Sequence, residues 1–123
     1  MRDPFDTPFL RMSITPDGAG KGKVVMEIQD DHISPSGTVH GGVYATVADN
    51  VMSAAISGVI ESGKRFVTIE LHVRYLRPVS EGSIVAESSV VKAGRRVVHT
   101  ECKMLNDAGD LLATASASYM VVD

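Results

Sequence analysis

The stretch SPSGTVHGGVYATVADNVMSAAISGVI, residues Ser34–Ile60, decides how the rest of this chain folds. A turn rich in proline, serine and glycine leads into His40-Gly41-Gly42, and an apolar run with helical spacing follows at once. A helix so apolar is normally buried on nearly every side, so other elements have to surround it. Its apolar surface is formed by Val43, Tyr44, Val47, Ala48, Val51, Met52, Ala55, Ile56 and Val59.

The polar residues of this helix gather in a narrow stripe, and one of them is charged. Asp49 is the only carboxylate between Gly41 and Ile60. Because burying a carboxylate is costly unless hydrogen bonds or a function compensate, Asp49 is a candidate functional group. The stripe consists of Thr46, Asp49, Asn50, Ser53 and Ser57.

Length and composition narrow the class of protein. The chain has 123 residues, 44% of them hydrophobic, which predicts one domain with a real core over residues 1–123. A net charge of −3 without a basic tail argues against nucleic acid as the main partner. Serines and Asp49 interrupt the apolar run, so we expect no membrane span. The single cysteine, Cys102, excludes an internal disulfide; we expect no secretory signal and a cytoplasmic location.

Six strand-like segments flank the helix, two before it and four after it. Residues 1–10 are expected to form an irregular arm. The helix is expected to run from about Gly41 to about Glu61, because Gly63 follows as a stop signal. The expected strands are Arg11–Thr15, Lys23–Gln29, Phe66–Leu76, Ser83–Val91, Arg96–Leu105 and Leu111–Val122, with a turn over Lys92–Arg95.

Two of these strands show informative patterns. Phe66–Leu76 alternates strictly, which predicts Val67, Ile69, Leu71, Val73 and Tyr75 on one face and Thr68, Glu70, His72 and Arg74 on the other. The last strand places Ala113, Ala115 and Ala117 on one face, where small side chains let a sheet approach a helix closely.

The order of elements predicts the fold class. One helix cannot cover a flat sheet and remain buried on most of its own sides, whereas a sheet curled around the helix buries both. The sequence therefore predicts an α+β fold of the hotdog type, with a curled antiparallel sheet wrapped around one long central helix.

The start of the helix is a candidate site. The first N–H groups of a helix lack partners and carry the positive end of its dipole, and Gly41 and Gly42 have no side chains that block access to them. Such donors suit a carbonyl oxygen that develops negative charge, although the glycines are equally explained by close helix–sheet packing. Asp49 lies eight residues further, about 12 Å along the axis. If both groups serve one reaction, an antiparallel second copy must bring Gly41 of one subunit near Asp49 of the other.

These residues resemble the PaaI-like acyl-CoA thioesterases of the hotdog superfamily. The resemblance rests on Gly37–Gly42, Asp49-Asn50, Val67–Ile69, Pro8–Arg11 and Tyr75–Pro78, and so spans almost the whole chain. It implies hydrolysis of acyl-CoA without a cofactor by an obligate homodimer, assembled further into a homotetramer. It leaves the acyl group open between aryl, phenylacetyl and aliphatic.

The resemblance also implies roles for single residues. Gly41 N–H would polarise the thioester carbonyl, with Gly42 beside it, and Asp49 of the other subunit would activate water or attack directly. Thr68 would hold that water or the carboxylate, and His40 would lie near the thioester sulfur. Further substrate contacts would come from Asn50 and from Ser34, which stands where many relatives have an asparagine with longer reach.

Other candidates are weaker. Arg77 and Arg95 flank strand ends and are expected either to pair with coenzyme A phosphates or to be solvated. His72 and His99 are expected to be solvated or to lie at a subunit contact, and Cys102 to be an inward, unreactive thiol. No set of ligands has metal-binding spacing.

Two alternative functions stay open at this point. A hotdog hydratase or dehydratase would pair the helix carboxylate with a histidine, for which His40 is the nearby candidate. A non-catalytic acyl-CoA-binding protein would bind the same ligand without releasing thiol.

Overall fold

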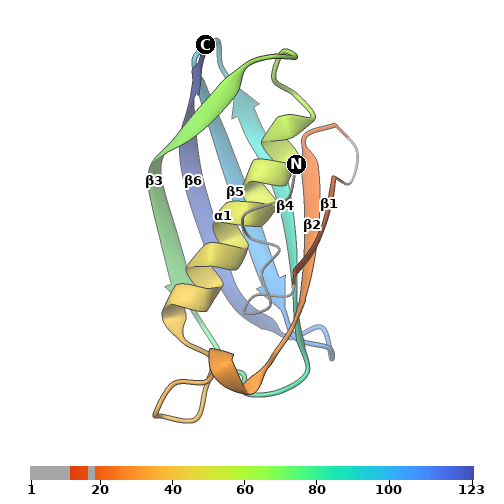
Figure 1. Ribbon diagram of the computed structural model, residues 1–123, viewed down its shortest axis with the longest axis vertical. Coiled ribbons are helices and arrows are strands. Elements are labelled where there is room, and N and C mark those ends of the chain that lie inside the picture. The colour runs from red at the N-terminus through yellow and green to blue at the C-terminus, as the bar shows by residue number, and fades with distance from the viewer. Residues whose placement is uncertain (1–11, 17–18) are drawn as a thin grey trace.

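The computed structural model describes residues 12–16 and 19–123. In these residues six strands form one antiparallel sheet in the order β1-β2-β4-β5-β6-β3, and one α-helix lies across its inner face (Figure 1). The predicted hotdog-type α+β fold is confirmed. The elements are β1 (Met12–Pro16), β2 (Lys21–Glu27), the short 3₁₀ helix η1 (Asp30–His32), α1 (Gly41–Ser57), β3 (Arg65–Tyr75), β4 (Ser83–Ala93), β5 (Val97–Leu105) and β6 (Leu111–Val122).

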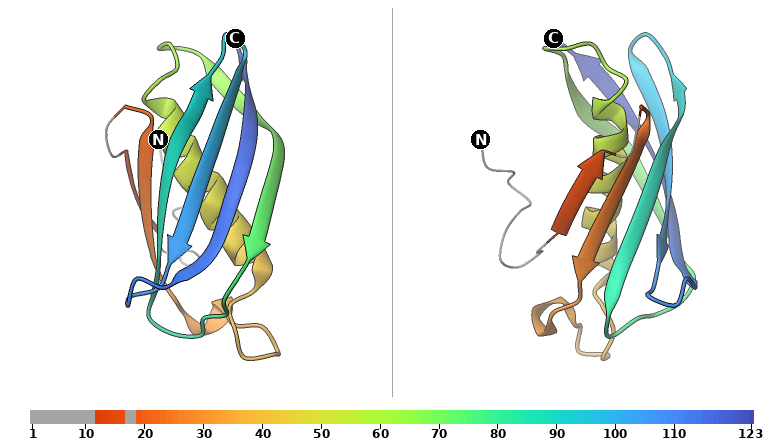
Figure 2. Two further views of the ribbon diagram at one scale, coloured as in Figure 1. Left: turned by 180° about the vertical axis from the view of Figure 1, so that it is seen from behind. Right: turned by 90° about the vertical axis from the view of Figure 1, so that its right-hand side faces the viewer.

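The sheet curls around α1, so that the helix contacts all six strands (Figure 2). Val47, Val51, Met52 and Ile56 have no exposed surface. Fully burying each such side chain stabilises the fold by about 1.5–3 kcal/mol. The predicted apolar helix surface is therefore confirmed, except at Val59, which is 38% exposed and lies beyond the end of the helix.

Close approach of the helix to the sheet depends on small side chains. A Cβ atom on Gly22 of β2 would lie 2.5 Å from the Val51 carbonyl oxygen, so only glycine fits there. On β4 the Ser88 hydroxyl donates to that same oxygen. On β6 the expected row of small residues is buried against the helix, as predicted: Ala113, Ala115 and Ala117.

The helix is shorter than expected, because it ends at Ser57 instead of near Glu61. Gly58 is the C-cap, and its N–H donates to the Ile56 carbonyl. Gly63, the expected stop signal, instead adopts a φ of 87° in the turn that leads into β3. The glycine nearest the helix, rather than the next one along the chain, terminates it.

The expected strands are present; β6 has the expected bounds, and the bounds of the other strands differ by one or a few residues. The main difference is in β4, which continues to Ala93, so that Lys92 belongs to a strand and not to the turn. A register shift between Val90 and Lys92 accompanies this extension. The irregular arm expected over residues 1–10 lies outside the described residues. Across residues 12–16 and 19–123, no helix combines the length and apolar content of a membrane span.

The expected strict alternation of Phe66–Leu76 is wrong, because β3 contains a bulge. Thr68 pairs with Tyr119 and Glu70 pairs with Ser118, which leaves Ile69 as an extra residue. An extra residue in one strand reverses the faces on which the following side chains lie. Before the bulge the helix-facing positions are therefore Phe66 and Thr68, and after it they are Leu71, Val73 and Tyr75.

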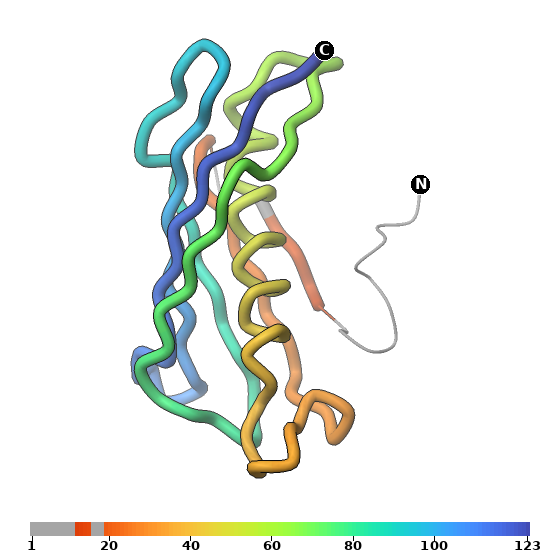
Figure 3. The backbone as a smooth tube through the Cα atoms, turned by 90° about the vertical axis from the view of Figure 1, so that its left-hand side faces the viewer, coloured from red at the N-terminus to blue at the C-terminus, as the bar shows by residue number. Residues whose placement is uncertain are grey.

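β3 forms one edge of the sheet and pairs with β6 on its other side (Figure 3). Val67 and Ile69 stand out from this edge strand, 52% and 51% exposed. A long edge strand with unpaired backbone groups and exposed apolar side chains can pair with a strand of another chain.

Candidate active site

Asp49 is held by two hydroxyl groups from the sheet. The Tyr119 hydroxyl donates to Asp49 Oδ1 over 2.7 Å, and Thr68 Oγ1 donates to the same oxygen over 3.4 Å. Among the described residues, Oδ2 has no hydrogen-bond partner. The carboxylate is thus oriented through one oxygen, while the other has no bond to the described residues.

Tyr119 was not identified from the sequence as a site residue. It is 1% exposed, and burial raises the pKa of its hydroxyl, with the hydrogen bond to Asp49 and the negative charge of that carboxylate raising it further. The hydroxyl therefore stays protonated and remains a donor. A signal for it existed, because Tyr119 continues the inward row Ala113, Ala115, Ala117 with a large side chain that carries a polar tip.

The bulge in β3 brings Thr68 to Asp49. With strict alternation Thr68 would lie on the same face of the strand as Glu70 and His72. That face is opposite to the one that carries Leu71, so Thr68 would point away from the helix. The register shift after Thr68 places it instead on the helix side, opposite Tyr119 in the sheet. The bond to Asp49 is long at 3.4 Å, so it supports the carboxylate more weakly than Tyr119 does.

At the start of α1 the backbone leaves two donors available. His40 is the N-cap; its carbonyl accepts from Val43 N–H over 3.0 Å, and its own N–H donates to the His32 carbonyl over 2.9 Å. Within the described part of the chain, the N–H groups of Gly41 and Gly42 have no acceptor. A Cβ atom on Gly42 would meet nothing within 4 Å, so this side of the helix start is open.

A cleft of about 340 Å³ lies beside Gly41. Tyr75 lines it, and its hydroxyl donates to the Gly41 carbonyl over 2.8 Å. The Tyr75 ring packs edge-on against Tyr44, with ring centroids 5.4 Å apart. The cleft is lined by Thr38, Val39, Gly41, Tyr44, Tyr75, Leu76, Arg77 and Pro78.

Of the remaining candidates from the sequence, Arg77 lines this cleft, whereas Ser34 and Asn50 do not. Arg77 lines it and forms an ion pair with Asp110 over 3.4 Å. Ser34 lies in the loop before α1, where its hydroxyl bonds that of Ser36 over 2.7 Å. Asn50 is 7% exposed and donates to the Thr46 carbonyl over 2.8 Å.

Arg95 lies far from Gly41 within one chain. It is in the turn between β4 and β5, next to the end of β6 at which Val97 pairs with Met120. The cleft lies at the other end of β6, where Tyr75 pairs with Ala113. The structure of one chain therefore places Arg77, but not Arg95, beside the helix start.

Gly41 and Asp49 also remain apart in one chain. Eight residues of helix separate them, about 12 Å along the axis. Asp49 faces Thr68 and Tyr119 near the start of β3, whereas Gly41 faces Tyr75 at the end of β3. One chain thus supplies the two halves of the candidate site at two separate places.

The groups considered weaker candidates have local roles. Cys102 is 6% exposed, which confirms the inward position of its thiol, and burial raises the pKa of that thiol to about 12. His72 bonds Glu70 over 3.2 Å on an exposed part of the sheet, and His99 bonds the buried Ser118 over 3.0 Å. In residues 12–16 and 19–123, no group of three or more His, Cys, Asp or Glu is arranged to hold a metal ion.

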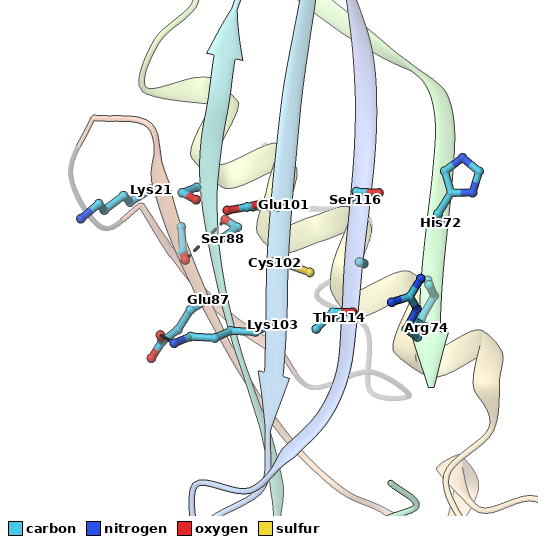
Figure 4. Close-up of a pocket in the computed structure, with 14 residues that line it drawn as sticks. Lys21, His72, Arg74, Glu87, Ser88, Glu101, Cys102, Lys103, Thr114 and Ser116 are labelled. Carbon is cyan, nitrogen blue, oxygen red and sulfur yellow. Dashed lines mark hydrogen bonds and ion pairs between the residues drawn. The ribbon is translucent and has the colours of Figure 1, made fainter. Parts of the chain in front are cut away.

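A hollow larger than the cleft beside Gly41 lies on another part of the described structure. It has a volume of about 970 Å³ and opens on the side of the sheet that faces away from α1 (Figure 4). Charges of both signs line it, including Lys103 and Glu87, which form an ion pair over 3.8 Å. The weaker candidates His72 and Cys102 line this hollow, but Gly41, Asp49 and Thr68 do not, so its size does not mark it as the reactive centre.

A family model and curated relatives match this chain. The family model described as thioesterase superfamily matches residues 36–113. Human acyl-coenzyme A thioesterase 13 is 34% identical over 104 residues, which cover 81% of this chain and 74% of the human protein.

Two solved structures share the fold. A phenylacetic acid degradation-related protein from Ralstonia eutropha JMP134 superposes with a TM-score of 0.88 at 26% identity, covering 98% of this chain and 92% of that one. A Bacillus halodurans protein solved with CoA superposes with a TM-score of 0.78 at 29% identity, covering 81% of this chain and 66% of that one.

Proposed function

This chain belongs to the thioesterase superfamily, and on that basis we propose that it hydrolyses acyl-CoA thioesters to a free acid and CoA. The observation that carries the proposal is the hydrogen bonding of the Asp49 carboxylate. Its carboxylate is fixed through Oδ1 by Tyr119 and Thr68, while Oδ2 has no partner among the described residues. A human relative named acyl-coenzyme A thioesterase and a structural neighbour solved with CoA support the choice of substrate class.

In the proposed reaction the thioester oxygen accepts hydrogen bonds at the start of α1. Gly41 N–H donates to it and stabilises the negative charge that develops there. Asp49 Oδ2 takes a proton from water as the water oxygen bonds to the carbonyl carbon. The tetrahedral intermediate then breaks its C–S bond, and the CoA thiolate leaves and takes up the proton that Asp49 removed from water. In the alternative route Oδ2 itself attacks the carbonyl carbon, the C–S bond breaks with loss of the CoA thiolate, and water then hydrolyses the resulting mixed anhydride.

The proposed site is shared between two copies of the chain. Gly41 and Asp49 of one helix are about 12 Å apart, too far to act on one carbonyl group. Pairing of two β3 edges supplies the second copy, and the half-exposed side chains of Val67 and Ile69 on that edge favour it. We propose an obligate homodimer with two equivalent sites, and a homotetramer formed from two such dimers.

The other candidate residues contact the rest of the substrate in this proposal. His40 lies near the thioester sulfur at the helix start, and Ser34 in the preceding loop contacts the leaving-group side. Arg77, at the wall of the cleft, pairs with phosphates of coenzyme A. Arg95 lies at the opposite end of the sheet, so it belongs to the proposed site only through the partner subunit.

The test of the proposed function is release of free thiol from a panel of acyl-CoAs. Benzoyl-CoA, phenylacetyl-CoA and medium- and long-chain acyl-CoAs represent the three classes of acyl group. A thioesterase releases CoA from at least one of them, and the class turned over fastest identifies the acyl group. A hydratase adds water to an enoyl-CoA without thiol release, and a binding protein releases none. Absence of thiol release across the whole panel would refute the proposal.

A further inference from the structure

The side chain of Tyr75 lies against the first residue of α1. Its hydroxyl donates to the Gly41 carbonyl oxygen over 2.8 Å. A Cβ atom on Gly41 would lie 3.1 Å from the Tyr75 hydroxyl oxygen and 3.3 Å from the ring carbon that carries it. The tyrosine therefore approaches this closely because residue 41 is a glycine.

The Gly41 carbonyl and the Gly42 N–H belong to one planar trans peptide group, in which they point in opposite directions. Fixing the direction of the carbonyl oxygen therefore fixes the direction of the Gly42 N–H. Two successive glycines have more backbone freedom than any other pair, so a hydrogen bond from outside the helix adds a restraint to the first turn of α1. Tyr75 supplies one from the end of β3.

We propose that Tyr75 is a positioning residue that holds the Gly42 N–H as a second donor to the thioester oxygen, beside the Gly41 N–H. This inference rests on the proposed thioesterase function and deepens it. The Gly42 N–H has no acceptor among the described residues, and the space beside Gly42 is open. Donors that already point at the developing charge stabilise a transition state without a cost of reorganisation.

The ring of Tyr75 is itself held by the helix it restrains. Tyr44, one turn into α1, is 4% exposed and packs edge-on against the Tyr75 ring at an interplanar angle of 88°. Tyr75 remains 54% exposed on its other side, where it borders the cleft. Because water reaches the hydroxyl from that side, we expect the effect of losing its hydrogen bond to be moderate.

The test is Tyr75→Phe, which keeps the ring and its packing against Tyr44 and removes only the hydroxyl. We expect kcat to fall about tenfold, with KM within about twofold of the wild type, because the lost interaction acts on the transition state. The melting temperature should stay within a few degrees. In amide spectra the Gly42 resonance should shift relative to that of Gly63, a glycine in a distant turn.

Thr46→Val is the matched control. The Thr46 hydroxyl donates to the Gly42 carbonyl over 2.9 Å, so this change also removes a hydroxyl from a carbonyl of the first turn. The N–H of that peptide belongs to Val43, which already donates to the His40 carbonyl over 3.0 Å. Since it cannot serve the thioester, we expect Thr46→Val to leave kcat within about twofold of the wild type.

The outcomes separate this inference from the proposed function. A wild-type protein that releases no CoA from any acyl-CoA refutes the function. An active wild type whose Tyr75→Phe variant has the same kcat, or an unmoved Gly42 resonance, refutes the role of Tyr75 alone. A loss of activity that only follows a loss of folded protein, or that Thr46→Val reproduces, assigns Tyr75 a structural role and also overturns the inference.

Discussion

Replacing Asp49 by asparagine tests the proposed mechanism most directly. The change keeps the shape of the side chain and an oxygen that still accepts from the Tyr119 hydroxyl, but removes the negative charge. A hydrogen bond to a charged group contributes about 1.5–3 kcal/mol and one between neutral groups about 0.5–1.5 kcal/mol, so the bond weakens by about 1 kcal/mol. Removing the desolvation cost of a partly buried charge offsets that loss. We expect a melting temperature equal to or above that of the wild type.

The expected effect on catalysis is much larger. Asparagine is neither a base nor a nucleophile, so both routes proposed for Asp49 are closed. We expect kcat to fall at least about a thousandfold, which corresponds to about 4 kcal/mol of transition-state stabilisation. Binding of acyl-CoA should persist, because the helix start and the cleft beside Gly41 are unchanged.

Both quantities should be measured on the same preparation, with free-thiol release for kcat and thermal unfolding for stability. Asp123→Asn is the matched control, because it removes an exposed carboxylate that pairs with Lys64 at the end of the chain. A dimer of Asp49→Asn that is folded and has near-normal kcat would refute the mechanism. A lower melting temperature with normal turnover would assign Asp49 a purely structural role.

Three further predictions concern Thr68, the β3 edge and the Cys102 thiol. Thr68→Ala should lower kcat by about threefold to tenfold, because the 3.4 Å bond to Asp49 is long; unchanged turnover would show that Thr68 serves only the strand. Val67→Lys on the β3 edge should give monomers in sedimentation experiments, and these monomers should be inactive. Val91→Lys, at a similarly exposed valine of β4, should leave the oligomeric state and the activity unchanged. An active Val67→Lys monomer would contradict the shared site. Because burial raises the pKa of the Cys102 thiol to about 12, iodoacetamide at pH 8 should leave the native protein unmodified and alkylate it only after unfolding.

The sequence by itself determined which segments form the helix and the strands, and it showed that the helix has to be buried by the sheet. The spacing of valine, alanine and isoleucine predicted a helix buried on most sides, and Val47, Val51 and Ile56 are indeed fully buried. The bounds of β6, Leu111–Val122, were also predicted, because turn residues and alternation mark that strand on both sides. The unusual position of Asp49 could be recognised because a lone carboxylate in an apolar segment carries a cost that local composition reveals.

The tertiary structure alone decided which groups meet. Asp49 and Tyr119 are separated by 70 residues, and Gly41 and Tyr75 by 34, so no local pattern links them. The bulge that turns Thr68 toward Asp49 depends on how β3 pairs with β6. A sequence pattern reports whether a segment is buried on one side, whereas strand register is set by the pairing of two distant segments, and a shift of one residue exchanges the faces.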